Sequence, residues 1–147
     1  MKSEPDTYSI DDLAAKSPNM WEGCRNYVVR NYLRDEMKDG DLAFFYHSSC
    51  PEAGIVGTMK IVGEPYPDPT QFDPSSDYFD EKSPKDNPRW VVHDVEFLEK
   101  YSRVISIAEL RAEPGLEEMV TLKKGNRLSI TRVSDAEWAI VEKMAKR

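Results

Sequence analysis

The sequence lacks the long apolar run that a membrane span or a secretion signal requires. Its longest uninterrupted apolar stretch is Leu42-Ala43-Phe44-Phe45-Tyr46, far short of the ~20 residues of a spanning helix. Cysteine is scarce too: Cys24 and Cys50 are the only two, with no C-x-x-C pair, so neither a zinc site nor a disulfide framework is predicted. We expect an intracellular, cytoplasmic protein with reduced thiols, no metal or other cofactor, and no membrane partner.

Basic residues are outnumbered by acidic ones, 20 against 27, for a net charge of −7. This balance disfavours binding of duplex DNA by non-specific charge neutralisation. The acidic excess is concentrated between residues 64 and 86, where seven acidic and two basic residues give −5. A locally basic surface elsewhere remains compatible with the sequence, because the field near a surface follows the local charges.

Signatures of the common enzyme classes are absent as well. The chain has no G-x-G-x-x-G, no Walker A sequence, no G-x-S-x-G and no H-E-x-x-H. Dinucleotide enzymes, P-loop hydrolases, common serine hydrolases and zinc peptidases therefore lack their motifs here. The sequence favours a non-catalytic function.

The composition is that of one globular domain spanning residues 1–147, with 39% hydrophobic and 10% aromatic residues. Serines three positions before an acid, at Ser9, Ser106 and Ser134, predict helix starts of the capping-box type. We predict an α+β fold around a small, mostly antiparallel, barrel-like sheet flanked by helices. The predicted helices are 10–16, 26–37, 106–112 and 135–145, and the predicted strands are 41–47, 54–63, 89–101 and 127–133.

The acidic segment 64–86 holds five of the ten prolines. Proline fixes φ and lacks an N–H donor, so Pro65–Pro69 is predicted to be neither a helix nor an inner strand. The embedded Phe72, Tyr78 and Phe79 favour an ordered loop that packs onto the body as a lid or pocket wall.

Trp21 is the most informative aromatic residue. It precedes a predicted helix and stands near Gly23, which is an exposed-looking setting for a large ring. One interpretation is ordinary packing. The other is a stacking wall for a planar ligand such as a base, where each stacked ring is worth ~1–3 kcal/mol.

Polar groups at the end of the 41–47 strand form a second candidate. His47, within Tyr46-His47-Ser48, suits either acid–base chemistry and base recognition or a solvated strand end. There are two basic clusters, Arg25, Arg30 and Arg34 near helical spacing, and Lys123-Lys124 with Arg127. Each suits either phosphate contacts or solvated surface.

Seven segments spread over nearly the whole chain carry a resemblance to a known family. They are Lys2–Asp6, Trp21–Tyr27, Arg30–Asn31, Phe45–Ser48, Gly54–Gly57, Tyr66–Pro69 and Asn87–Val91. In order and composition they resemble the EVE domain family. The resemblance implies a PUA-like fold, a compact barrel flanked by helices, related to the YTH domains that read methylated adenine in RNA.

The resemblance also implies a site and a partner. Members look like readers of modified bases in DNA or RNA, so the expected partner is nucleic acid, presenting a single-stranded or flipped base. Family members generally carry an apolar stretch before the Lys-Ser-Glu-Pro motif, so the first strand is expected to be shortened or frayed here. Carried over by position, the implied base pocket is Ser3, Trp21, Asn26, Tyr46, His47, Ser48 and Tyr66. In the binding hypothesis, Arg25, Arg30, Lys123 and Lys124 hold flanking phosphates.

The sequence is compatible with three functions. The first is a non-catalytic module that takes a base out of its stack and holds it against Trp21. The second, by analogy with ASCH domains of the same fold, is a hydrolase of a modified nucleoside that would use His47 with Asp68 or Glu4. The third is a protein-interaction adaptor that contacts a basic partner through the acidic loop.

Overall fold

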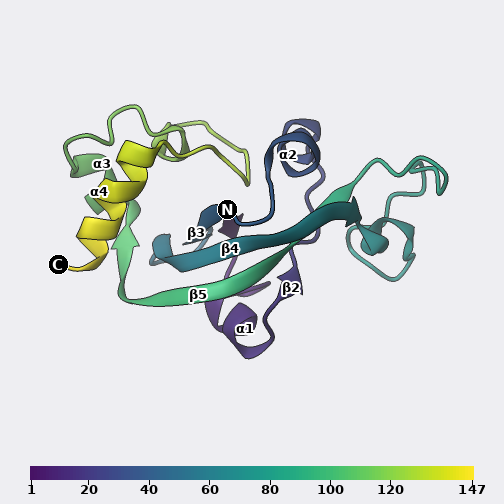
Figure 1. Ribbon diagram of the computed structural model, residues 1–147, viewed down its shortest axis with the longest axis horizontal. Coiled ribbons are helices and arrows are strands. Elements are labelled where there is room, and N and C mark those ends of the chain that lie inside the picture. Colours follow the sequence, from purple (N-terminus) through teal and green to yellow (C-terminus); the bar gives the residue numbers. More distant parts are fainter.

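The computed structural model describes all residues from Met1 to Arg147, and its centre is one five-stranded sheet (Figure 1). The strand order is β1-β3-β4-β5-β2. The β1 strand is parallel to β3, and the other neighbours are antiparallel. The strands are β1 (Lys2–Ser3), β2 (Asn19–Met20), β3 (Leu42–His47), β4 (Gly54–Pro67) and β5 (Val91–Ser106).

Helices cover both faces of this sheet. One core contains Ile10 and Val29, from α1 and α2, and packs on the face that Phe45 enters. The other contains Leu110 and Val141, from α3 and α4, and packs on the opposite face. The helices are α1 (Ile10–Ala15), α2 (Tyr27–Asn31), α3 (Ile107–Ala112) and α4 (Asp135–Ala145). The predicted α+β class with flanking helices is confirmed, and no helix has the length and apolarity to cross a membrane.

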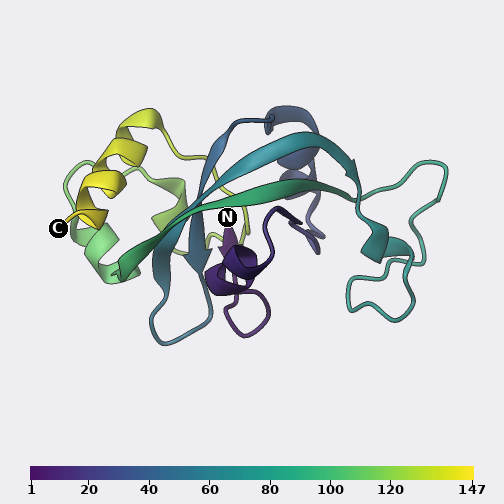
Figure 2. The same ribbon diagram turned by 60° about the horizontal axis from the view of Figure 1, so that its bottom comes forward.

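The predicted barrel does not close. Strands β4 and β5 are long and arch across the molecule (Figure 2), with register irregularities that increase their twist. The edge strands β1 and β2 have two residues each, and they pair with β3 and β5 rather than with each other. The sheet therefore curls but keeps a gap between its two edges.

Serine capping starts the helices as the sequence predicts. Ser9 with Asp12 and Ser134 with Glu137 form reciprocal capping boxes. At α3 the Ser106 hydroxyl accepts from the Glu109 N–H at 3.1 Å, but the Glu109 carboxylate is paired with Arg103 instead. The cap hydroxyl is therefore used at all three starts, while the returning acid is used at two.

Four predicted elements need correction. In the segment predicted as a helix over 26–37, the α-helix ends at Asn31 and a π-helical turn, Tyr32–Glu36, follows it. The strand predicted over 127–133 is wrong, because this segment is irregular; the Ser129 carbonyl accepts one backbone hydrogen bond from the Lys2 N–H of β1 at 2.7 Å. Strands β4 and β5 extend to Pro67 and Ser106, further than predicted.

The prolines of β4 are tolerated because of where they lie. Pairing of β3 with β4 ends at Lys60, whereas β5 still pairs with β4 at Pro67. Beyond Lys60, β4 is therefore an edge strand on the side away from β5. Proline, which has no N–H to donate, is tolerated on such an edge. The first strand, β1, has two residues and pairs with Tyr46 and His47 of β3.

Gly57 allows β4 and β5 to approach closely at the bend. A Cβ at this position would lie 2.1 Å from the Glu99 carbonyl oxygen and 2.4 Å from Ile10 Cδ1. We expect Gly57→Ala to lower the free energy of unfolding by about 1–3 kcal/mol, the usual range for overpacking, in urea denaturation. An unchanged denaturation midpoint for this variant would contradict the close approach.

Candidate functional site: the cavity between the sheet edges

A cavity of about 360 Å³ lies in the gap between the two edges of the sheet. Both edge strands contribute to its lining, and the chain on either side of Trp21 forms another wall. Because the barrel is open at this point, side chains rather than strand pairing fill the gap. The lining residues are Lys2, Ser3, Glu4, Thr7, Tyr8, Asn19, Met20, Trp21, Glu22, Gly23, Cys24, Tyr78 and Ser129.

Trp21 is a wall of this cavity and a member of the core. Its ring packs edge-on against Phe45 at 5.3 Å and against Tyr8 at 6.3 Å between ring centroids, and only 6% of the residue is exposed. The exposed setting expected from sequence is therefore wrong, because the apolar surroundings of the first core hold the indole. The cavity lies beside the indole, as the base-pocket hypothesis requires.

Tyr8 is held in place by its neighbours on the two edges. The Ser3 hydroxyl donates to the Tyr8 carbonyl at 2.7 Å, and the Asn19 amide donates to the Tyr8 hydroxyl at 3.1 Å. Burial raises the pKa of Tyr8 above its ordinary value, so the phenol keeps its proton at neutral pH. These contacts connect β1 to β2 across the gap and preorganise the ring.

Cys24, at the inner end of the lining, is chemically inert. Burial raises the pKa of its thiol to about 11, and a thiol that keeps its proton is a poor nucleophile. The residue fills space in the core beside the cavity, as its burial shows.

Tyr78 brings the long loop to the cavity, and Gly23 makes room for it. Gly23 has φ +85°, and a Cβ there would lie 2.6 Å from Tyr78 Cζ. The ring therefore lies directly over the backbone of the Trp21 segment. The prediction that this loop provides a pocket wall is confirmed, since Tyr78 lines the cavity.

A buried carboxylate, Asp68, fastens the start of that loop. It accepts from the Gly23 N–H at 3.1 Å and from Arg25 Nη1 at 3.0 Å, and the backbone and hydroxyl of Thr70 also donate to it. Burial alone would raise the pKa of Asp68, but the hydrogen bonds from Thr70, Gly23 and Arg25 outweigh it and hold the pKa below its ordinary value.

Arg25 joins Asp68 to Tyr78. Besides the ion pair, its guanidinium donates to the Tyr78 carbonyl at 2.8 and 3.0 Å and to the Thr70 hydroxyl at 3.0 Å. The guanidinium also lies over the rings of Tyr78 and Trp90, 5.7 and 5.5 Å from their centroids. The donors of Arg25 are therefore used within the protein, and the predicted contact of Arg25 with a phosphate is not supported.

The stacking continues beyond Trp90 to the surface. Tyr27 stacks on Trp90 at 4.9 Å between centroids, and the Arg30 guanidinium lies 4.7 Å from the Tyr27 ring centroid. Arg30 also donates to the Arg89 carbonyl at 3.3 Å and has no carboxylate partner. A chain of stacked rings and cations thus connects Tyr78, in the cavity wall, to Arg30, which has no carboxylate partner.

The other residues implied by the family resemblance lie elsewhere. Of the seven proposed for the base pocket, only Ser3 and Trp21 line this cavity. Asn26 caps α2 by accepting from the Val28 N–H at 2.8 Å, and Tyr66 donates to Asp94 at 2.6 Å. The Ser48 N–H donates to the Ser3 carbonyl, and Tyr46 packs in the second core.

His47 positions a helix. Its Nε2 accepts from the Ile10 N–H at 3.1 Å, at the start of α1, and burial lowers its pKa below the ordinary value. Neither Asp68 nor Glu4 is hydrogen-bonded to it. The acid–base set suggested for a hydrolase is therefore not assembled in this structure.

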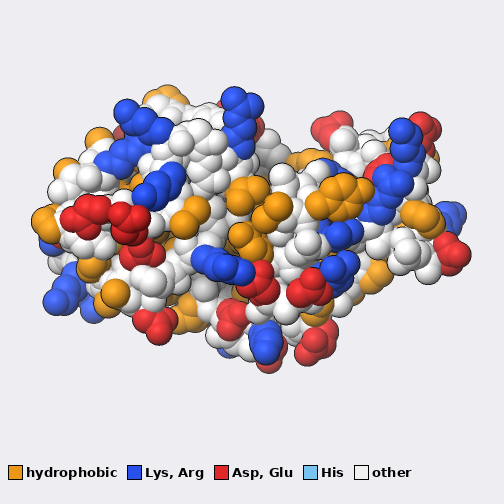
Figure 3. All heavy atoms as spheres, turned by 90° about the horizontal axis from the view of Figure 1, so that it is seen from above, with side chains coloured by type: hydrophobic (Ala, Val, Ile, Leu, Met, Phe, Trp, Pro, Cys, Tyr) orange, Lys and Arg blue, Asp and Glu red, His pale blue; other side chains and the backbone are white.

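Among the predicted phosphate contacts, Lys123 pairs with Glu118 at 3.3 Å, while Arg30 and Lys124 have no carboxylate within ion-pair distance. Lysine and arginine side chains are interspersed with acidic ones on the face that carries α2 (Figure 3). The net charge of −7 is thus distributed without one dominant patch on this face.

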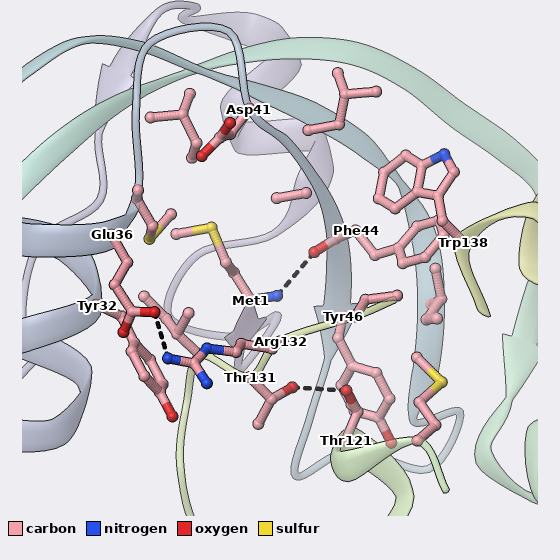
Figure 4. A pocket seen from close by; sticks show the side chains of 18 of the residues that line it. Met1, Tyr32, Glu36, Asp41, Phe44, Tyr46, Thr121, Thr131, Arg132 and Trp138 are labelled. Carbon is pink, nitrogen blue, oxygen red and sulfur yellow. Dashed lines mark hydrogen bonds and ion pairs between the residues drawn. The ribbon is translucent and has the colours of Figure 1, made fainter. Parts of the chain in front are cut away.

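A larger cavity of about 590 Å³ borders β3 and the segment that leads to α4 (Figure 4). Its walls include the stacked rings of Phe44 and Trp138, 3.8 Å apart, and an ion pair of Arg132 with Glu36. It flanks the part of β3 that β1 leaves unpaired. Its lining is mainly apolar, and none of it comes from the Trp21 segment, so we assign the candidate site to the smaller cavity.

Several lining residues escaped the sequence reasoning, including Tyr8, Asn19, Glu22, Tyr78 and Ser129. The sequence contained a local indication for two of them. Tyr8 lies two residues after the Lys2–Asp6 segment, and Glu22 is adjacent to Trp21. The others reach the cavity from distant positions in the chain, which no local pattern indicates.

An open curled sheet with helices on both faces and a cavity between its edges defines a PUA-like α+β domain. More narrowly, the chain belongs to the EVE domain family, whose model matches residues 1–144. It is 43% identical to human thymocyte nuclear protein 1 in an alignment 159 positions long, which covers 96% of this chain and 70% of that protein. The zebrafish protein of the same name is 48% identical, with 96% and 68% covered.

Solved structures agree with this assignment. A Pseudomonas syringae protein superposes with a TM-score of 0.95 at 43% identity, covering 99% of this chain and 97% of that one. Human thymocyte nuclear protein 1, crystallised in complex with 5-methylcytosine-containing DNA, gives 0.93 at 41% identity, covering 100% and 96%.

The Asp68 anchor yields a stability prediction. Asp68→Asn leaves the partly buried Arg25 without its counter-charge, and we expect a loss of about 3 kcal/mol in the free energy of unfolding at pH 7. Because the native pKa is depressed, the stabilisation is complete above the unfolded pKa of about 4 and is lost as pH falls through the native pKa. Urea titrations at pH 7 and pH 3 measure both effects.

The exposed ion pair of Asp11 with Lys100, 2.9 Å apart, is the matched control. Asp11→Asn should cost no more than about 1 kcal/mol at pH 7. Equal losses from the two variants would show that Asp68 is no more than another surface charge.

Proposed function

We propose that this domain is a non-catalytic nucleic-acid-binding module that holds one modified base in the cavity between the sheet edges. The observation that carries the proposal is the cavity itself, walled by Trp21, Tyr8 and Tyr78. The DNA complex of the human relative supports a ligand of this kind, since that protein was crystallised with DNA containing 5-methylcytosine. We extend this ligand class, a methylated base in a DNA strand, to the present chain.

The energetics are adequate for a base taken out of its stack. Extrusion costs a few kcal/mol, least for a single-stranded base, and contact with aromatic walls returns ~1–3 kcal/mol per base. A methyl group buried in the cavity adds about 0.8 kcal/mol. The methyl mark is therefore expected to improve affinity by about fourfold over the unmodified base.

Tyr78 offers a clean test of the cavity, because it lies on the loop and its removal spares the core. We expect Tyr78→Ala to weaken binding of a single-stranded oligonucleotide containing one 5-methylcytosine by about tenfold, the loss of one stacking wall. Fluorescence anisotropy measures the dissociation constants. Phe79→Ala is the matched control, because Phe79 is the next residue, is 40% exposed and does not line the cavity.

Binding that is equally strong in wild type and Tyr78→Ala would contradict this cavity as the base site. The thermal midpoints of both variants, measured by circular dichroism, identify any loss that comes from unfolding.

We further propose that Arg30 and Lys124 contact flanking phosphates, because neither is paired with a carboxylate. Each contact to a single strand contributes about −0.7 to the slope of log affinity against log salt. Arg30→Gln should therefore make the slope about 0.7 shallower, measured by anisotropy between 50 and 200 mM salt.

Arg34→Gln, which removes an arginine already paired with Asp35 at 2.8 Å, should leave the slope unchanged. A slope that is the same for Arg30→Gln and wild type would remove Arg30 from the interface.

A further inference from the structure

Glu22 is a charged residue at the cavity that has no partner within the protein. It follows the Trp21 wall and precedes Gly23, over which the Tyr78 ring lies, and it is one of the lining residues. No hydrogen bond or ion pair holds its carboxylate, although Arg25 is three residues away. That arginine is fully engaged with Asp68, Thr70 and the Tyr78 carbonyl.

Glu22 lines the same cavity as the two tyrosine walls, Tyr8 and Tyr78. Its negative charge contributes, after burial, to the raised pKa of both tyrosines. Burial, and then the charge of Asp68, raises the pKa of Glu22 itself, while Arg25 acts in the opposite direction. An unpaired acid at the edge of a cavity is a free acceptor for a ligand.

The neighbouring polar groups are largely satisfied within the protein. The Ser3 hydroxyl donates to the Tyr8 carbonyl. The Asn19 amide donates to the Tyr8 hydroxyl, and its oxygen accepts from the Met20 N–H at 3.0 Å. Two carboxylates of the lining, those of Glu4 and Glu22, remain without a partner, and Glu22 is the one adjacent to the Trp21 wall. An ionised carboxylate accepts hydrogen bonds and donates none.

Bases differ in what they offer such an acceptor. Cytosine carries an amino group at position 4, whereas thymine and uracil carry a carbonyl oxygen there, and carboxylates accept from the cytosine amino group. A carbonyl oxygen facing an ionised carboxylate places two acceptors together with no donor between them, which is unfavourable.

We propose that Glu22 determines specificity in this cavity by accepting a hydrogen bond from the exocyclic amino group of the bound base. The cavity then selects amino-bearing bases such as 5-methylcytosine over their oxo counterparts. This inference rests on the proposed function, and it names the chemical class of base that the site takes.

The decisive ligands are single-stranded oligonucleotides identical except for one central residue: 5-methylcytosine, thymine or an abasic site. 5-Methylcytosine and thymine carry the same methyl group and differ at the amino or oxo position and the adjacent ring nitrogen. For wild type we expect about tenfold tighter binding of 5-methylcytosine than thymine, the usual value of a hydrogen bond to a charged group.

Glu22→Gln offers an amide that both donates and accepts, and Glu22→Ala removes the acceptor. We expect both variants to bring the 5-methylcytosine to thymine ratio close to one. Glu52→Gln makes the same charge change at an exposed position on the turn between β3 and β4, and it should keep the wild-type ratio.

Each outcome separates the two proposals. A wild-type ratio near one, with both bases binding more tightly than the abasic strand, overturns the role of Glu22 and leaves the base cavity standing. A wild-type preference that survives both Glu22 variants also overturns it. Equal binding of all three oligonucleotides overturns the base cavity itself.

Discussion

The buried carboxylate of Asp68 is the contact on which the rest of the site depends. It joins the end of β4 to the Trp21 segment through the Gly23 N–H and Arg25, and without it the long loop would have no charged anchor beside the cavity. A buried carboxylate is stable only when donors surround it. Here four donations from three residues meet that requirement, and the same donors bring Tyr78 into place through Arg25.

The open sheet explains why the cavity lies where it does. A closed barrel would pair β1 with β2 and fill the gap with backbone, whereas two-residue edge strands leave room for a ligand-sized space. The hydrogen bonds among Ser3, Tyr8 and Asn19 cross this gap with side chains. The gap is thus held open by the same groups that shape its walls.

The acidic character of the chain is consistent with recognition by shape and hydrogen bonding more than by bulk charge. Two of the seven acidic residues of the loop are held within the structure: Asp68 is buried, and Asp80 accepts from the Trp90 indole at 2.8 Å. The adaptor hypothesis, which assigned the loop to a basic partner, stays a prediction. In the proposed function, unpaired cations such as Arg30 make weak backbone contacts to nucleic acid, and the cavity selects the base.

What the sequence determined by itself is local. Serine caps at Ser9, Ser106 and Ser134, the three main strands and the family motifs are readable because each depends on residues within a few positions of one another. Tertiary structure decided the rest: Arg25 serves an acid 43 residues away, the Ser129 segment lies beside β1 without forming a strand, and Tyr78 and Glu22 share one cavity with Trp21. The use of a side chain depends on which distant partner folding brings to it, and no local pattern encodes that partner.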